Sequence, residues 1–278
     1  MTQDVTQDST QGVLLSVEHL TRRFGGIVAN NDVSFQVQKG SITALIGPNG
    51  AGKTTVFNCI TGFYSASEGH VYLTQPEGRI EVGSLLRRKV TGGSYLVARA
   101  GIARTFQNIR LFKDMTVLEN LLVAQHRKQN RNLFSGLLVT PDFSDREEAS
   151  LARAFEWLET VNLSEDANRL AGELSYGRQR RLEIARAMCT NPVIICLDEP
   201  AAGLNPRETR ELSALIRKLR SEYDVTVLLI EHDMGLVMDI SEHIIVMDQG
   251  KVIDAGTPEH IRNSEVVIAA YLGTEVED

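Results

Sequence analysis

One short stretch of the chain, GPNGAGKT at residues 47–54, has the residue types and spacing that bind phosphate groups. It matches the pattern G-x-x-x-x-G-K-[ST], whose glycines let backbone N–H groups converge on phosphate oxygens. We expect Lys53 to reach the β- and γ-phosphates of a nucleotide and the Thr54 hydroxyl to bind Mg²⁺. The expected nucleotide-binding residues here are Gly47, Pro48, Asn49, Gly50, Ala51, Gly52, Lys53, Thr54 and Thr55.

Two acidic residues, Asp198 and Glu199, come directly after the apolar segment VIICL at 193–197. A carboxylate at the end of a strand, in a chain with a phosphate loop, is placed to hold Mg²⁺, and we expect Asp198 to do so through water. No apolar residue stands beside Glu199 to draw it into the core, so its side chain should face the nucleotide-binding cleft. There it can orient or deprotonate an attacking water molecule.

A histidine, His232, lies just after another apolar segment, VTVLLI at 225–230. In open α/β sheets, ligands bind outside the C-terminal ends of the strands. The phosphate loop, the acidic pair and His232 all follow strands, so they should meet at one sheet edge, where His232 would contact the γ-phosphate. Gln107, in RTFQNIRLF, could reach Mg²⁺ or the water, although its residue type alone favours a surface amide.

Strand and helix patterns alternate around these motifs, which predicts an α/β core. Asn205, Pro206 and Glu208 have the types and spacing of a capping box that starts a helix. The expected strands are 14–20, 31–37, 41–47, 193–197, 225–230 and 243–247. The expected helices are 54–62, 117–129, 145–161, 206–222 and one starting at Thr257.

The middle of the chain, from about residue 108 to 174, has helical patterns and few strand signals. In the helix at 145–161, Ala149, Ala152, Phe155 and Leu158 lie roughly on one stripe, which we expect to be buried. The single tryptophan, Trp157, belongs to the same helix. We expect it to pack in the interior.

The composition is that of an ordinary globular protein, with 42% hydrophobic and 23% charged residues among 278. The formal net charge of −7 argues against a nucleic-acid partner. The three cysteines form no C-x-x-C pair and are expected to be buried thiols. The first twelve residues are polar and lack the pattern of a secretory signal, and no apolar run approaches the roughly 18–20 residues of a membrane span. We therefore expect a cytosolic protein whose membrane role, if any, comes through partners.

Five motifs in this order, GPNGAGKTT, TFQ, LSYGRQ, LDEP and EHD, make the chain resemble the ATPase subunits of ABC transporters from about residue 13 onward. The resemblance implies ATP and Mg²⁺ as cofactors. It implies an α/β fold: a RecA-like P-loop core with a mixed sheet, an N-terminal antiparallel β-subdomain and an inserted α-helical subdomain. After a disordered tail at 1–12, the single ATPase domain would span 13–278. Its core would be 13–107 and 179–278, and its helical subdomain about 108–178.

The resemblance also implies roles for four residues outside the phosphate loop. Gln107 matches the family's Q-loop glutamine, which would serve both Mg²⁺ binding and catalysis. Phe24, in RRFGG, matches the aromatic residue that stacks on adenine. Ser175 and Gly177 match the signature segment, which contacts the γ-phosphate of ATP held by the phosphate loop of another subunit.

The signature stretch ELSYGRQRR, at 173–181, departs from the family pattern. Tyr176 replaces a glycine and Arg178 replaces a glutamine, and in the later D-loop Asn205 stands where an acid is usual. The arginines could form a nucleic-acid patch, but a helix starting at Ser175 with a solvated, partly paired basic face explains them. Whether Arg178 lies near the phosphate or points to solvent stays open.

Longer stretches, among them RTFQNIRLFKDMTVLENLLVAQH and DEPAAGLNP, resemble the LivG-like ATPases of branched-chain amino acid importers. That resemblance implies a second ATPase subunit, identical or different, two integral-membrane permease subunits and an extracytoplasmic solute-binding protein. It also implies a place on the cytoplasmic face of the inner or plasma membrane. A surface near Gln107, around residues 109–115, is the expected docking site for a permease helix.

Other classes of function compete with this interpretation. A urea-type import ATPase or a lipopolysaccharide-export ATPase would have a similar sequence. A soluble ABC ATPase acting on DNA or ribosomes would usually carry two cassettes or a coiled-coil insertion, and this chain has one phosphate loop and no heptad run. A regulatory module without turnover is disfavoured by the presence of both Glu199 and His232.

Overall fold

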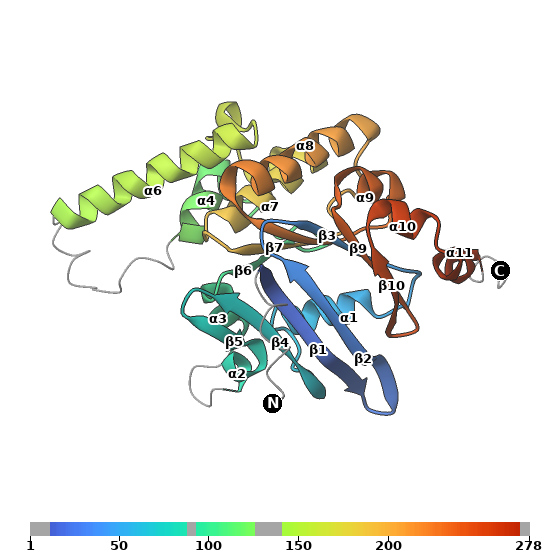
Figure 1. Ribbon diagram of the computed structural model, residues 1–278. Helices are drawn as coiled ribbons and strands as arrows, with labels where there is room; N and C mark the ends of the chain where they lie inside the picture. Colours follow the sequence, from blue (N-terminus) through green and yellow to red (C-terminus); the bar gives the residue numbers. More distant parts are fainter. Residues whose placement is uncertain (1–11, 88–92, 126–140, 273–278) are drawn as a thin grey trace.

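Two β-sheets form the framework of the computed structural model, which describes residues 12–87, 93–125 and 141–272 (Figure 1). The first is antiparallel, with the strand order β2-β1-β4-β5. Its strands are β1 (Val13–Phe24), β2 (Ile27–Gln38), β4 (Glu68–Gln75) and β5 (Gly78–Glu81). The expected antiparallel sheet is confirmed, and the expected tail at 1–12 lies outside the described residues except for Gly12.

The second sheet is mixed and carries the functional motifs, with the strand order β10-β9-β3-β8-β7-β6. Its strands are β3 (Ile42–Ile46), β6 (Ile102–Arg104), β7 (Ile194–Asp198), β8 (Thr226–Ile230), β9 (His243–Asp248) and β10 (Lys251–Gly256). β10 pairs antiparallel with β9, and the other neighbours are parallel. The expected mixed sheet is therefore confirmed. β4, β5, β6 and β10 were not predicted.

Helices cover both faces of the mixed sheet, so its central strands are buried throughout. The helices are α1 (Lys53–Ile60), α2 (Val82–Leu86), α3 (Ser94–Arg99), α4 (Val117–Gln125), α6 (Pro141–Thr160), α7 (Tyr176–Met188), α8 (Pro206–Tyr223), α9 (Met234–Ile240), α10 (Pro258–Arg262) and α11 (Glu265–Leu272). None of these described helices is long and apolar enough to cross a membrane.

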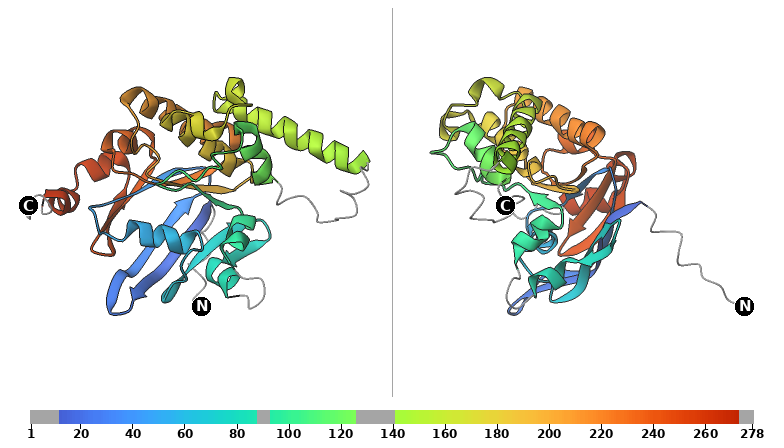
Figure 2. Two further views of the ribbon diagram at one scale, coloured as in Figure 1. Left: turned by 180° about the vertical axis from the view of Figure 1, so that it is seen from behind. Right: turned by 90° about the vertical axis from the view of Figure 1, so that its left-hand side faces the viewer.

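The two faces of the mixed sheet contribute to two separate cores. In β7, Ile195 and Leu197 point into one core while Ile194 and Cys196 point into the other, which is the period-two alternation of a strand. One core is shared with α1, which lies between the two sheets, and the other with α7, α8 and α9 (Figures 1 and 2). α1 is thereby held rigidly behind the phosphate loop that precedes it.

The helical segment inserted between β6 and β7 contains α4, α6 and two short 3₁₀ turns, Ser164–Asp166 and Ala171–Glu173. The long helix α6 extends away from the sheets (Figure 2). The stripe predicted for it is buried only at Leu158 and was wrong at the other three residues: Ala149 and Ala152 are exposed, and Phe155 is 44% exposed. The predicted helix at 117–129 is described only as far as Gln125.

The inner face of α6 is instead formed by Ala154, Trp157 and Leu158, which are all buried. Trp157 lies 4.5 Å from the ring of Tyr223 at the end of α8, centroid to centroid. The prediction that Trp157 packs in the interior is confirmed. The rotation of the helix is set by this contact with α8, which a local apolar pattern does not contain.

The capping box expected at the start of α8 is present. The Asn205 side chain accepts hydrogen bonds from the backbone N–H groups of Arg207 and Glu208, and the Glu208 carboxylate accepts from the Asn205 N–H. Pro206 occupies the first turn, where its missing N–H costs no hydrogen bond. These local contacts fix the point at which the chain leaves the segment after Glu199.

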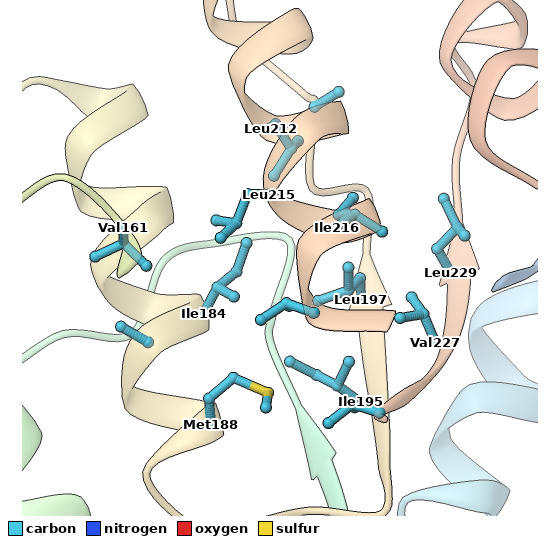
Figure 3. Close-up of a cluster of buried hydrophobic side chains, with 14 of the residues drawn as sticks. Val161, Ile184, Met188, Ile195, Leu197, Leu212, Leu215, Ile216, Val227 and Leu229 are labelled. Atoms are coloured by element: carbon cyan, nitrogen blue, oxygen red, sulfur yellow. The ribbon is translucent and has the colours of Figure 1, made fainter. Parts of the chain in front are cut away.

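The apolar face of α8 packs on the mixed sheet and α7, as Figure 3 shows. Ile216 is fully buried there. We expect Ile216→Ala to lower the free energy of unfolding by about 2–5 kcal/mol, because it removes buried methylene groups and leaves a cavity. Urea denaturation measures this loss. Ser221→Ala, on the exposed face of α8, is the control and should change stability by no more than about 0.5 kcal/mol.

All three cysteine thiols are free and buried, as expected. Burial raises the pKa of Cys59 to about 11 and the pKa values of Cys189 and Cys196 to about 12. The thiols therefore stay protonated at neutral pH and act as small apolar side chains in the two cores.

Candidate functional site: the sheet edge beside the phosphate loop

The phosphate loop connects β3 to α1 and has a backbone that only glycine allows at two points. Gly47 has a φ of 149°, and a Cβ atom there would lie 2.0 Å from the carbonyl oxygen of Met247. Gly52 has a φ of 91°, and a Cβ atom there would lie 2.5 Å from the Asn30 Nδ2 atom. The loop can therefore lie tightly against β9 and β2 while its outer part, at Asn49 and Gly50, stays exposed.

Two contacts from distant segments hold the loop in this shape. The Asn30 side chain donates to the Gly52 carbonyl oxygen at 3.1 Å. The Gly250 N–H, in the turn between β9 and β10, donates to the Ala51 carbonyl oxygen at 3.1 Å. Neither support was predicted, because both depend on strand pairing far from the loop in sequence.

Lys53 is the first residue of α1, and its side chain lies inside the loop. Its ammonium group donates to the carbonyl oxygens of Gly47 at 2.6 Å and Pro48 at 2.9 Å. Burial lowers the pKa of Lys53, and the Glu199 carboxylate partly offsets that shift. A buried positive charge thus lies against the carbonyl oxygens of the loop, while the neighbouring residue Thr54 is exposed.

Glu199 lies at the centre of a hydrogen-bonded cluster that joins three of the predicted residues. One carboxylate oxygen accepts from Gln107 Nε2 at 2.7 Å, and the other lies 2.8 Å from His232 Nε2. Residue 199 itself has a φ of 46°, a left-handed conformation that turns the chain sharply after β7. The structure therefore brings Gln107, Glu199 and His232 together at the C-terminal ends of β6, β7 and β8.

Asp198, at the end of β7, is buried and forms an ion pair with Arg104 at 2.7 Å. Arg104 also donates to Asn58 and Thr61, and its guanidinium lies 5.1 Å from the centroid of the Phe106 ring. Sequence reasoning missed Arg104. The signal available was a charged residue inside an otherwise apolar strand segment, GIAR, which needs a buried partner of opposite charge.

Glu231 is a second residue that sequence reasoning missed. It is 3% exposed and accepts hydrogen bonds from three backbone N–H groups: Ala201 at 2.6 Å, His232 at 2.9 Å and Asp233 at 3.3 Å. Burial raises its pKa, and these N–H groups oppose the rise. Glu231 thereby ties the segment after Glu199 to the segment that carries His232.

The signature residues begin α7, as predicted, with Ser175 as the N-cap residue. A Cβ atom on Gly177 would lie 2.5 Å from the Glu208 carboxylate, so the first turn of α7 fits closely against the start of α8. Phe24 lies at the end of β1. Its ring and that of Tyr64 are in T-shaped contact, with their centroids 5.2 Å apart. Ser175, Gly177 and Phe24 lie outside the hydrogen-bonded cluster around Glu199.

The two arginines that made the signature stretch ambiguous have specific partners. Arg178 pairs with the buried carboxylate of Asp166 at 2.6 Å, so its side chain is directed toward the inserted helical segment. Arg180 is fully buried, so the prediction of a solvated basic face was wrong at this position. Leu182, Ala185 and Cys189, in and just after the same helix, are also buried.

We expect Arg178→Gln to lower the free energy of unfolding by no more than about 1 kcal/mol, because the arginine is 44% exposed and Arg169 also pairs with Asp166. The ATPase rate and its dependence on salt should not change. Steady-state hydrolysis at two ionic strengths measures both. A shifted salt dependence would instead place the Arg178 charge near bound phosphate.

Comparison with known proteins agrees with this geometry. A family profile described as "ABC transporter" matches residues 30–202, and one described as "Branched-chain amino acid ATP-binding cassette transporter" matches residues 252–277. The chain is 57% identical over 260 residues to the high-affinity branched-chain amino acid transport ATP-binding protein BraF of Pseudomonas aeruginosa, covering 94% of this chain and 98% of that protein. It is 54% identical to the corresponding protein LivG of Escherichia coli, with the same coverage.

Solved structures give the same result. An ATP-binding cassette of an ABC transporter in its ADP conformation is 35% identical, with a TM-score of 0.77 covering 94% of this chain and 99% of that one. A dimeric bacterial ABC transporter cassette is 27% identical, with a TM-score of 0.72 covering 88% and 99%. The chain belongs to the ABC transporter family, as one of its ATP-binding cassette proteins.

Proposed function

We propose that this chain hydrolyses ATP and powers an importer of the branched-chain amino acids Leu, Ile and Val. The observation that supports hydrolysis is the Glu199 carboxylate, held by Gln107 and His232 at the same sheet edge as the phosphate loop. The substrate class follows from the relatives, which match over nearly their whole length and are named for branched-chain amino acid transport.

In this proposal, Glu199 accepts a proton from the water that attacks the γ-phosphate. Gln107 and His232 fix the direction of its carboxylate, and Lys53 stabilises the negative charge that develops on the phosphate oxygens. Phe24 stacks on the adenine. Ser175 and Gly177 contact the ATP held by a second ATPase subunit, identical or different, so two ATP molecules lie between the two chains.

The residues proposed for Mg²⁺ are Thr54, Gln107 and Asp198, which offer a hydroxyl, an amide oxygen and a carboxylate. Hard oxygen ligands of this kind suit Mg²⁺, which commonly binds one or two carboxylates together with substrate phosphates. The exposed Thr54 fits that set, and Asp198, which is buried at the end of β7 and paired with Arg104, would act through water. When bound, Mg²⁺ would neutralise charge on the phosphates.

The proposed partners include two permease subunits, which would hold the chain on the cytoplasmic face of the membrane, and a solute-binding protein outside it. A pocket of about 440 Å³ is lined in part by Phe106, the neighbour of Gln107, and is the proposed contact site for side chains of a permease helix. Its lining includes Phe63, Tyr95, Phe106, Phe112 and Arg186. Phe112, from the expected docking surface at 109–115, is 50% exposed there.

Amino-acid uptake by the reconstituted complex tests this function. Proteoliposomes containing the chain, the second ATPase subunit and the permeases should accumulate labelled leucine when ATP and the binding protein are present. Glu199→Gln in this chain is the matched control and should abolish ATP-driven uptake. Uptake of urea instead of leucine, or ATPase activity that only DNA or ribosomes stimulate, would contradict the proposed substrate or class.

A further inference from the structure

Two charged residues on α7, Arg180 and Glu183, are buried as a pair. The Arg180 side chain is 0% exposed and the Glu183 side chain 2% exposed, and their Nη1 and Oε2 atoms lie 2.8 Å apart. Removing two charges from water is costly unless further hydrogen bonds satisfy both groups. The groups that hydrogen-bond to Arg180 and Glu183 therefore indicate the role of this pair.

Those partners are mainly backbone groups of one short segment, residues 106–110. Arg180 donates to the carbonyl oxygens of Phe106 at 2.6 Å and Gln107 at 2.8 Å. Glu183 accepts from the N–H groups of Phe106 at 3.3 Å and Arg110 at 3.2 Å. The pair thus forms hydrogen bonds with both ends of the segment. We name these two residues the Arg180–Glu183 clamp.

The segment held by the clamp is the one that carries Gln107. The Gln107 side chain donates to the Glu199 carboxylate, while its backbone carbonyl is held by Arg180. Arg180 is thus hydrogen-bonded to the backbone of Gln107, and the side chain of Gln107 contacts Glu199, the proposed general base. The hydrogen bonds of Arg180 reach Phe106, Gln107, Tyr176 and Glu183, so its effect on Glu199 and His232 would pass through Gln107.

The other side of the clamp faces the signature segment. Arg180 donates to the Tyr176 hydroxyl at 3.1 Å, one helical turn earlier in α7. Tyr176 lies between Ser175 and Gly177, and its ring lies 3.3 Å from where a Cβ atom on Gly203 would stand. The clamp therefore connects three segments: residues 106–110, the start of α7 and the loop after Glu199.

We propose that the Arg180–Glu183 clamp is a positioning device that fixes Gln107 to α7, so that Gln107 orients Glu199 only when the signature helix is in place. The proposal rests on the proposed ATP hydrolysis. A guanidinium is planar and makes several hydrogen bonds in fixed directions, so it transmits a displacement of α7 to the segment at 106–110. Arg180 and Glu183 are thus positioning residues that act through Gln107.

A double-mutant cycle with Gln107 tests the proposal. Arg180→Met with Glu183→Leu removes the clamp as a pair, because apolar replacement of both partners leaves no unpaired buried charge. We expect kcat for ATP to fall about 10- to 100-fold with little change in KM, as after Gln107→Ala. Combining the clamp variant with Gln107→Ala should cause no further loss. Additive losses would overturn the proposal.

Hydrogen exchange gives a second readout that does not depend on ATP. The amides of Phe106 and Arg110 should exchange faster in the clamp variant, while those of β8 keep their protection. Unchanged exchange at both amides would overturn the proposal. If the double replacement does not fold, Glu183→Gln, which keeps the shape of the side chain, is measured in the same way.

Arg181→Met is the matched control. Arg181 is the next residue on α7, and it contacts Glu211 at 3.8 Å and the Val161 carbonyl oxygen at 3.3 Å. Its replacement should leave both kcat and the exchange of residues 106–110 unchanged, and a loss equal to that of the clamp variant would indicate a general effect of α7. A parent chain that does not hydrolyse ATP would contradict the proposed function itself, whereas a hydrolysing parent with unchanged exchange in the variant would contradict only the clamp.

Discussion

Glu199→Gln should bind ATP normally and hydrolyse it about 10²- to 10⁴-fold more slowly, the range that a general base contributes. The amide has the same shape as the carboxylate. It can accept a hydrogen bond from Gln107 through its oxygen and donate one to His232 through its nitrogen, so the cluster should keep its geometry. The lost property is the ability to take a proton from water, and the change therefore separates basicity from position.

Single-turnover and steady-state hydrolysis, together with ATP titration, measure this result. Glu222→Gln is the control, because Glu222 lies on the exposed side of α8 and its ion pair with Lys218 is at the surface. It should leave both rates unchanged. Near-normal turnover in Glu199→Gln would assign the proton transfer to another group and leave Glu199 a structural role at most.

Lys53→Ala should weaken ATP binding by about 10- to 150-fold, since hydrogen bonds to charged groups contribute about 1.5–3 kcal/mol each. The ammonium group is buried at the start of α1, where it donates to the neutral carbonyl oxygens of Gly47 and Pro48. Exchanging these for phosphate oxygens would give it a partner of opposite charge, and alanine removes that gain.

Titration with a fluorescent ATP analogue measures the affinity, with Lys218→Ala on α8 as the surface-lysine control. Thermal unfolding without nucleotide should accompany the titration, because Lys53→Ala also removes the bonds to Gly47 and Pro48. A variant that unfolds at the parent temperature and still binds the analogue equally well would contradict the role of Lys53 in the phosphate loop.

Polar contacts made by residues without a predicted role at the site hold the predicted residues in place. Arg104 holds Asp198, Glu231 holds the backbone on either side of the Glu199–His232 contact, and the Arg180–Glu183 clamp holds the segment of Gln107. Each is buried, where a hydrogen bond is stronger and an unmade one is more costly than in water. The side chains proposed to meet ATP are therefore positioned by groups that would not touch it.

The sequence by itself determined the features that depend on neighbouring residues. The glycines of the phosphate loop, the helix start at Ser175 and the capping box at Asn205 follow from local backbone chemistry. The convergence of Glu199, His232 and the phosphate loop followed from one further rule, that parallel strands end at the same sheet edge. The strands β4 and β5 escaped prediction because both are largely half-buried or exposed and β5 has only four residues, which weakens the apolar alternation that marks a strand.

Only the tertiary structure decided where the charged side chains go. Arg178 and Arg180 stand two positions apart on one helix, yet the first is 44% exposed beside Asp166 and the second is fully buried beneath residues 106–110. The rotation of α6, with Phe155 outward and Trp157 against Tyr223, was decided in the same way. A charge or a ring is buried when segments distant in sequence supply its partners, and no local pattern in the chain carries that information.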